Sequence, residues 1–266
     1  MVGEVEGPPL ATAKNRTVIP RILHYCWVGS RSLPGKLKAY QDSWSRHLPG
    51  WRIRAWGNGD IDLTHPFLRR VTAQGHWGQV SDYLRWQAVY EEGGIYFDTD
   101  VEVVRPLGDT SRWPSFLGFE NVQNRVRKNP VGTAIFGFEK GHSLPREMLR
   151  FYERHPDRTI LNTDVLTRLM LAKGLRHYHL KREDFECVTI DGVRIYHSDI
   201  FYPNLARHPE WASSPPPQTM TFHHVEGSWG GTRLDPLPLA RRIFDARWDR
   251  KILRPVEKAL KKAFRK

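Results

Sequence analysis

Two aspartates at the end of an apolar run have the spacing of a cation-binding pair. Residues 93–101 have the sequence GGIYFDTDV, so Asp98 and Asp100 directly follow an expected buried strand. In an extended chain both carboxylates point to the same side, and their repulsion amounts to roughly 1–4 kcal/mol near a protein surface. A divalent cation removes that repulsion, and oxygen ligands suit Mg²⁺ or Mn²⁺ better than Zn²⁺. The structural alternative is a solvated strand end whose acids pair with Arg or Lys.

Three residues that precede this strand could contribute to a binding site. Asp82 and Arg85 are three positions apart on an expected helix and therefore share one face. An ion pair within the helix is the structural alternative for them. Trp27 stands at the end of the first expected strand, where its ring could stack on a nucleobase. Packing in the core is the structural alternative for this side chain.

A third group of polar side chains follows the last expected strand. Residues 223–231 have the sequence HHVEGSWGG, which gathers His223, His224, Glu226, Ser228 and Trp229 before two glycines. An aromatic-rich turn that closes the domain is the structural alternative. The order of the three groups along the chain is more specific than any one of them.

The elements that must position these side chains alternate between strand and helix. Strands are expected over 17–29, 51–57, 95–104, 114–120 and 132–140, with a late strand and loop over 193–203. Helices are expected over 33–50, 79–94, 143–155 and 163–175. In the helix over 79–94, Ser81 can cap the start and Gly93-Gly94 end it. This alternation predicts an α/β sheet domain, whose ligands bind at the carboxyl ends of strands.

Length and composition are those of a globular protein. The chain has 266 residues, of which 39% are hydrophobic and 12% aromatic, enough for a sizeable core. Cys26 and Cys187 form no CxxC motif, so neither a disulfide framework nor a zinc site is indicated, although one bridge between them stays open. We see no signal peptide and no apolar run of about 18 residues. We therefore expect a cytoplasmic protein, soluble or peripheral on the inner face of the membrane.

The net charge of +12 is concentrated near the end of the chain. Residues 237–266 carry a net +8, and the rest of the chain carries +4. We expect a flexible leader over 1–17, a folded α/β domain over 18–235 and a basic amphipathic helical tail over 236–266. The tail is either a solvated helix packed on the domain or a contact to an anionic membrane surface.

Three stretches together resemble a known family. Residues 19–27 (IPRILHYCW), 81–85 (SDYLR) and 93–101 (GGIYFDTDV) resemble the DXD-containing sugar transferases of glycosyltransferase family 32. That family includes fungal Golgi mannosyltransferases and bacterial capsule transferases, and it is distantly similar to the large glucosylating toxins. The resemblance extends from about residue 18 to about residue 231, and the joined pattern SDxxR…GGxYxDxD is highly specific.

The resemblance implies a GT-A fold, a nucleotide-sugar donor (UDP- or GDP-sugar) and Mn²⁺ or Mg²⁺. It implies that the nucleobase of the donor stacks on Trp27. The ribose, sugar or diphosphate of the donor would contact Asp82, Arg85, Asp98, Ser228 and Trp229. The metal ligands that it implies are Asp98, Asp100, Glu226 and His224, with His223 as the other histidine candidate. Asn162 and Asp164 are expected sugar or acceptor contacts, although residues 160–170 depart from the family's motif at this position.

The resemblance also implies transfer with retention of the anomeric configuration. Asp82, Arg85, Asp98 and Asp100 are the expected catalytic residues. Because no conspicuous nucleophile stands out, we favour a same-face displacement assisted by the leaving diphosphate. The expected acceptor is a glycan, a lipid-linked saccharide or another hydroxyl compound.

Two other functions fit parts of the sequence. An apolar strand followed by Asp-x-Asp also occurs in haloacid-dehalogenase-type phosphohydrolases, but there the motif usually opens the domain and a small residue stands where this chain has Glu102. The high positive charge and the ten Trp would suit a nucleic-acid-binding protein, but the charge lies mainly in the tail and not beside the aromatic residues.

Overall fold

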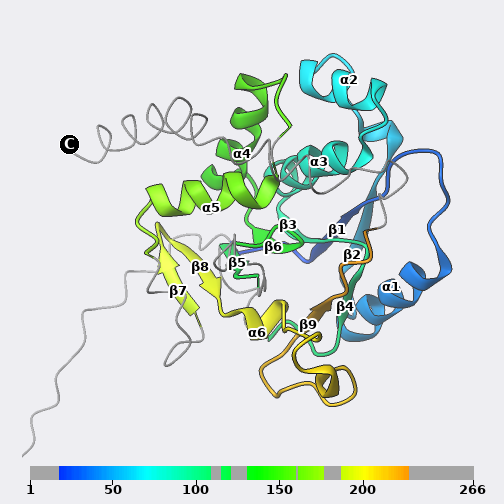
Figure 1. Ribbon diagram of the computed structural model, residues 1–266, viewed down its shortest axis with the longest axis vertical. Helices are drawn as coiled ribbons and strands as arrows, with labels where there is room; N and C mark the ends of the chain where they lie inside the picture. The colour runs from blue at the N-terminus through cyan, green and yellow to red at the C-terminus, as the bar shows by residue number, and fades with distance from the viewer. Residues whose placement is uncertain (1–17, 109–114, 121–130, 160, 177–186, 228–266) are drawn as a thin grey trace, which may run out of the picture.

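A seven-stranded mixed sheet forms the centre of the molecule (Figure 1). The structure is a computed structural model, and it describes residues 18–108, 115–120, 131–159, 161–176 and 187–227. The strand order is β2-β1-β3-β6-β5-β8-β7. These strands span Arg52–Trp56 (β2), Ile22–Cys26 (β1), Gly94–Phe97 (β3), Ile135–Phe138 (β6), Ser115–Gly118 (β5), Val193–Tyr196 (β8) and Cys187–Ile190 (β7).

The first three neighbours run parallel, and the direction changes at β6. Strand β1 pairs in parallel with both β2 and β3, whereas β6 runs antiparallel between β3 and β5. A second sheet consists of two antiparallel strands, Val101–Val103 (β4) and Thr221–His223 (β9). Only three residues separate the end of β3 from the start of β4, but β4 belongs to the other sheet.

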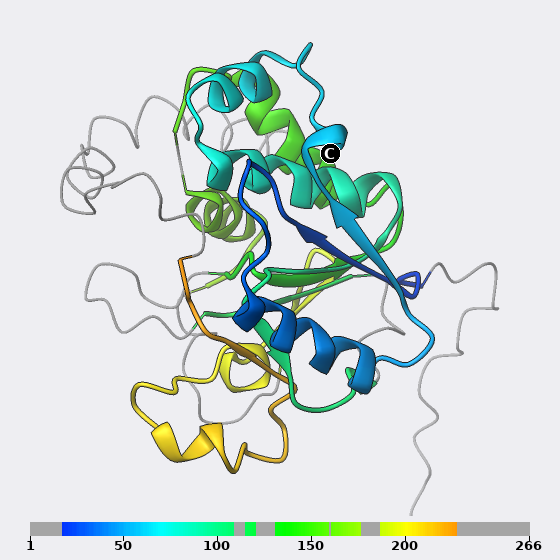
Figure 2. The ribbon, with the colours of Figure 1, turned by 90° about the vertical axis from the view of Figure 1, so that its right-hand side faces the viewer.

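Helices cover both faces of the large sheet (Figure 2). One face carries Pro66–Ala73 (α2), Trp77–Glu91 (α3), Ser143–Arg154 (α4) and Asn162–Ala172 (α5); the other carries Gly35–His47 (α1) and Ser198–Phe201 (α6). Short 3-10 turns span Asn58–Asp60 and Pro209–Ala212. The predicted α/β fold, with a mixed sheet flanked by helices, is confirmed.

Each face of the sheet has its own hydrophobic core. On the first face, Trp86 of α3 stacks on Phe136 of β6, with ring centroids 4.3 Å apart. On the second face, Trp44 of α1 packs edge-on against Phe97 of β3, at 5.8 Å. Both tryptophans are fully buried. Tyr96 of β3 also stacks on Phe136, with ring centroids 5.4 Å apart, so β3 is packed on both faces immediately before the two aspartates.

Helix α1 also holds the strand that follows the aspartates. The indole Nε1 of Trp44 donates to the carbonyl oxygen of Val101 at 2.7 Å, and the hydroxyl of Ser43 accepts from the backbone N–H of Val103 at 2.9 Å. These buried bonds satisfy backbone groups on the side of β4 that faces away from β9. The chain around Asp98 and Asp100 is therefore anchored at both ends.

The turn from α3 into β3 depends on two glycines and a buried histidine. Gly93 and Gly94 have φ values of +68° and +115°, a region that side chains disfavour. His24 is fully buried; its Nε2 contacts the carbonyl oxygen of Gly93 at 2.7 Å, and its Nδ1 accepts from Trp56 Nε1 at 3.1 Å. Since Trp56 can only donate, Nδ1 is unprotonated and Nε2 donates to Gly93. The glycine end of the helix, predicted from the sequence, is confirmed.

Three details of the sequence prediction differ from the structure. The strand expected over 95–104 is divided into β3 and β4 by a turn at residues 98–100, because the N–H of Val101 bonds to the carbonyl of Asp98. Ser81 does not cap α3, which starts four residues earlier, at Trp77. Helices α2 and α6 and strands β7 and β9 were not predicted.

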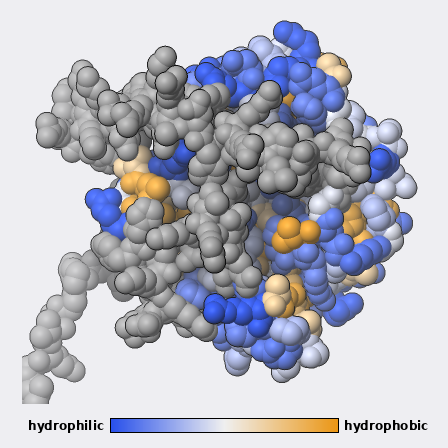
Figure 3. Space-filling model, viewed as in Figure 1, coloured by the Kyte–Doolittle hydropathy of each residue, from blue (hydrophilic) through white to orange (hydrophobic). Residues whose placement is uncertain are grey.

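The described surface is mostly polar. Among the described residues the exposed large hydrophobic side chains are Val18, Ile53, Leu63 and Val225, and the described part of the face in Figure 3 is largely hydrophilic. Within the described ranges no helix is long and apolar enough to cross a membrane. Cys26 and Cys187 are both free thiols, so the bridge left open above is not formed. The expected leader and basic tail lie outside the described residues.

We expect Gly94→Ala to destabilise the protein by about 3 kcal/mol or more, because it combines backbone strain with a steric clash. A Cβ at Gly94 would lie 2.5 Å from the carbonyl oxygen of Ile22 in the neighbouring strand. Gly50 is the matched control: its φ of +77° is also positive, but a Cβ there meets nothing within 4 Å. Gly50→Ala should therefore cost only about 1 kcal/mol. Denaturant unfolding of the two variants measures both values, and equal losses would contradict this role for Gly94.

Candidate donor and metal site

Asp98 and Asp100 occupy a tight turn between the two sheets. The N–H of Asp98 donates to the carbonyl oxygen of Ala134 at 2.9 Å, which ties the turn to β6. Asp100 is 6% exposed as a whole residue, and about a fifth of the Asp98 side chain is exposed. The two carboxylates are brought together by a turn, and the extended geometry assumed from the sequence is wrong here.

A buried guanidinium lies between two of the acids. Arg85 is 4% exposed, and its nitrogens lie 3.1 Å from Asp82 Oδ1 and 3.2 Å from Asp98 Oδ1. It also donates to the carbonyl oxygen of Thr133 at 2.8 Å and lies over the ring of Tyr96, 4.9 Å from its centroid. The ion pair with Asp82, which was the structural alternative for these residues, is therefore present. With so little exposed surface, Arg85 acts mainly by fixing the two acids.

Asp98 receives a second fixed hydrogen bond. The hydroxyl of Tyr96 donates to Asp98 Oδ1 at 2.9 Å, and the Tyr96 ring is almost fully buried in β3. The carboxylate is thus oriented by Arg85 from α3 and by Tyr96 from its own strand.

Asp82 lies on the same side of the turn and is held by α5. Its side chain is one-fifth exposed, and its Oδ1 accepts from Asn162 Nδ2 at 3.2 Å. Burial raises the pKa of Asp82 to about 6, although the charge of Arg85 and the bond from Asn162 act in the opposite direction. Asp82 thus keeps its proton to a higher pH than an ordinary aspartate does.

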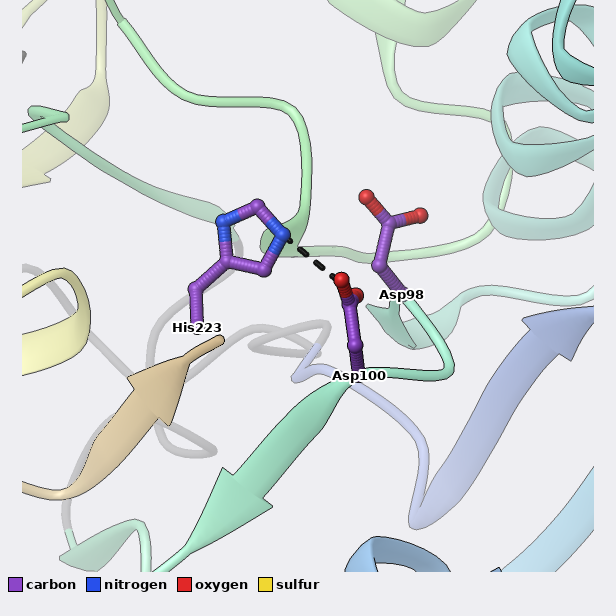
Figure 4. Close-up of side chains that lie close together, drawn as sticks. All are labelled: Asp98, Asp100 and His223. Carbon is purple, nitrogen blue, oxygen red and sulfur yellow. Dashed lines mark ion pairs between the residues drawn. The ribbon is translucent and has the colours of Figure 1, made fainter. Parts of the chain in front are cut away.

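His223 approaches the aspartates from the end of β9 (Figure 4). Its Nε2 lies 3.4 Å from Asp100 Oδ1, while Asp100 Oδ2 accepts from the backbone N–H of Glu226 at 2.8 Å. Burial alone would raise the pKa of Asp100, but His223 and that N–H outweigh it and lower the pKa. Burial would likewise lower the pKa of His223, but Asp100 and then Asp98 outweigh it and raise the pKa.

These three side chains have the arrangement of a metal-binding group. One ligand atom from each of Asp98, Asp100 and His223 lies within 4.8 Å of the other two. Among the residues that the structure describes, no other three His, Cys, Asp or Glu side chains bring their ligand atoms this close together. Two carboxylate oxygens and one imidazole nitrogen are suitable ligands for a divalent transition metal.

The structure turns two of the expected metal ligands away from this group. His224 Nε2 lies 2.9 Å from Glu102 Oε2, and its ring stacks on Tyr40. The Glu226 carboxylate pairs with Lys36 at 2.5 Å and accepts from the Tyr40 hydroxyl at 3.1 Å. Of the two histidines considered from the sequence, the structure therefore brings His223, and not His224, to the aspartates.

The remaining predicted residues are more scattered. Trp27 is partly exposed beyond β1, and its Nε1 donates to the carbonyl oxygen of Arg31 at 2.8 Å, so the ring is not part of either core. Asp164 is partly exposed on α5, and Ser228 and Trp229 lie outside the described residues. The role of Tyr96 was missed, although its position two residues before Asp98 in the segment GIYFD was a usable signal.

Comparison with known proteins finds a related region in the first half of the chain. Residues 34–122 match the family model described as the glycosyltransferase sugar-binding region containing a DXD motif. The match includes Asp82, Arg85, Asp98 and Asp100. Residues 34–122 are therefore similar to the DXD-containing region of glycosyltransferases. The predicted resemblance is confirmed, and the match favours neither a haloacid-dehalogenase-type phosphohydrolase nor a nucleic-acid-binding protein.

The individual relatives are distant in sequence. The chain is 26% identical over 137 residues to inositol phosphoceramide mannosyltransferase 3 of Schizosaccharomyces pombe, covering 50% of this chain and 36% of the relative. It is 27% identical over 99 residues to the uncharacterized glycosyltransferase L373 of Acanthamoeba polyphaga mimivirus, covering 35% of this chain and 39% of that protein. The chain thus spans less than half the length of these curated relatives. The alignment with the solved structure of the PaToxG glycosyltransferase covers 58% of this chain and 69% of that protein, with 18% identity and a TM-score of 0.47.

The raised pKa of Asp82 gives a testable dependence of stability on pH. Between about pH 4 and pH 6 the unfolded chain releases the Asp82 proton while the folded protein still holds it, so the wild type loses stability as the pH rises. Asp82→Asn removes this titration. The difference in unfolding free energy should move in favour of the variant by about 2 kcal/mol between pH 4 and pH 7. Denaturant unfolding of both proteins at several pH values measures it. A difference that stays constant would show that Asp82 titrates normally.

Proposed function

We propose that the protein is a metal-dependent, retaining hexosyltransferase of GT-A type. It would transfer a hexose from a UDP- or GDP-sugar to a glycan, a lipid-linked saccharide or another hydroxyl acceptor. The observation that carries the proposal is the convergence of Asp98, Asp100 and His223 beside the Asp82–Arg85 pair, inside a chain that matches a sugar-binding DXD region. The S. pombe relative is a mannosyltransferase, which agrees with a hexose donor.

The residues present fit a divalent cation. Asp98, Asp100 and His223 would hold it, because their ligand atoms already lie close together and Asp100 is ionised, with a lowered pKa. An imidazole beside two carboxylates favours Mn²⁺ over Mg²⁺, which prefers an all-oxygen shell. The bound ion would neutralise the charge that develops on the diphosphate leaving group.

The loop after β1 fits the nucleobase end of the donor. The side chain of Asn58 bonds to both the N–H and the carbonyl of Gly29, at 2.8 and 2.9 Å, which fixes the loop that carries Trp27. An aromatic ring held in this way can stack on a base with little loss of conformational entropy. Trp27 is therefore our candidate for the base contact.

Side chains of the protein itself position the carboxylates of the site and balance their charge. Arg85 and Tyr96 hold Asp98, while Asp82 faces the donor sugar or ribose from α3. We infer that the reaction retains configuration by a same-face displacement in which the leaving diphosphate assists the acceptor hydroxyl. The basic tail over 236–266 would contact an anionic membrane surface at the cytoplasmic face, which suits a lipid-linked acceptor.

We expect Asp100→Asn to lower Mn²⁺-dependent release of nucleoside diphosphate from the donor by about 100-fold or more, because a fixed charge at the reacting phosphate is lost. Glu102→Gln is the matched control: this acid is two residues further along, pairs with His224 and lies outside the proposed site. It should leave turnover within about two-fold. The measurement is a screen of UDP- and GDP-sugars with Mn²⁺ or EDTA. Near-wild-type turnover by Asp100→Asn, with its melting temperature retained, would overturn the proposal.

A further inference from the structure

Asn162 was expected to contact the sugar or the acceptor, but its surroundings indicate a different role. The residue is 4% exposed at the start of α5, so it offers almost no surface to a ligand. Asn162 on α5 contacts two other helices: α3 supplies Asp82 and Trp86, and α4 supplies Tyr152.

The hydrogen-bonding capacity of the Asn162 amide is fully used. Oδ1 accepts from Trp86 Nε1 at 2.8 Å and from the Tyr152 hydroxyl at 3.1 Å. Nδ2 donates to the backbone carbonyl and to the carboxylate Oδ1 of Asp82, both at 3.2 Å. An amide oxygen has two lone pairs and an amide nitrogen two hydrogens, so no group is left for a sugar hydroxyl.

The orientation of the amide is also determined. Trp86 Nε1 can only donate, so the atom facing it must be the oxygen, and the NH₂ group must face Asp82. Since Trp86 is fully buried and stacked on Phe136, the hydrogen-bond donor that sets this orientation is itself fixed by the core. The packing of Trp86 against the sheet thus determines the orientation of the Asn162 amide, and the amide determines the position of the Asp82 carboxylate.

We propose that Asn162 is a positioning residue that holds the Asp82 carboxylate toward the donor, and that it is not a ligand of the sugar. This inference rests on the function proposed above. The groups that face Asp82 are Arg85 from α3, Asp98 from the β3–β4 turn, Tyr152 from α4 and Asn162 from α5. Among them Arg85 balances the charge of Asp82, and Asn162 fixes its direction without adding a charge.

The test is a double-mutant cycle of Asn162→Asp and Asp82→Asn on the full chain. Asn162→Asp keeps the shape and the acceptor for Trp86 and Tyr152, but it replaces the two donors with a second carboxylate beside Asp82. We expect a lower melting temperature and a loss of about 100-fold in kcat/KM for the donor. The double variant restores an amide beside a carboxylate, so it should recover at least half of the decrease in melting temperature that Asn162→Asp causes. Its kcat/KM should stay within about two-fold of Asp82→Asn alone, because both changes act through the same group.

Two outcomes would overturn the inference. A further loss of about 10-fold or more in the double variant, relative to Asp82→Asn, would show that Asn162 contacts substrate independently. Melting-temperature losses that simply add would show that the two side chains are not coupled.

Tyr152→Phe is the control for packing alone, because it removes one donor to Asn162 and leaves both bonds to Asp82 in place. Its kcat/KM should remain within about three-fold of the wild type, and a loss equal to that of Asn162→Asp would also overturn the inference. If the wild type turns over no nucleotide sugar, the proposed function fails, while the melting temperatures of the four proteins in the cycle still decide whether Asn162 and Asp82 are coupled.

Discussion

The buried guanidinium of Arg85 is the interaction on which the rest of the site depends. Three carboxylates, those of Asp82, Asp98 and Asp100, lie around one turn, and like charges at such distances repel strongly in a partly dry environment. Arg85 compensates two of them from a position that is almost inaccessible to solvent. Its loss would leave the carboxylates of Asp82 and Asp98 with hydrogen bonds from Asn162 and Tyr96 but without a compensating charge, which is costly for groups that are largely removed from water. The third carboxylate, that of Asp100, is compensated from the opposite side by His223.

The backbone around these charges is fixed by both sheets. Strand β3 belongs to the large sheet and β4 to the small one, so the turn at residues 98–100 joins two separately packed layers. Trp44 and Ser43 hold β4 against α1, while His24 and the glycine turn hold the start of β3. His223 arrives on β9, which pairs with β4 so that Val101 is opposite His223. The small sheet is thus the element that brings a residue from the end of the domain to the aspartates.

Much of this could be predicted from the sequence, and the failures have physical reasons. The alternation of strands and helices, the glycine end of α3 and the grouping of Asp82 and Arg85 with the aspartates follow from local patterns. The turn at residues 98–100 does not, because an apolar run with β-branched residues continues on both sides of it, and only long-range pairing separates the two strands. The choice of His223 over His224 depends on the register of β9 against β4. The role of Asn162 depends on three helices meeting, which a single segment cannot reveal.

The central claim is that Asp98, Asp100 and His223 hold a divalent cation, and Mn²⁺ binding tests it most directly. Electron paramagnetic resonance of free Mn²⁺ can be used to titrate the wild type, His223→Ala and His224→Ala in the presence of UDP or GDP. The account predicts that His223→Ala weakens Mn²⁺ binding by about 10-fold or more, while His224→Ala stays within about two-fold of the wild type. Equal weakening by both variants, or weakening by His224→Ala alone, would contradict it.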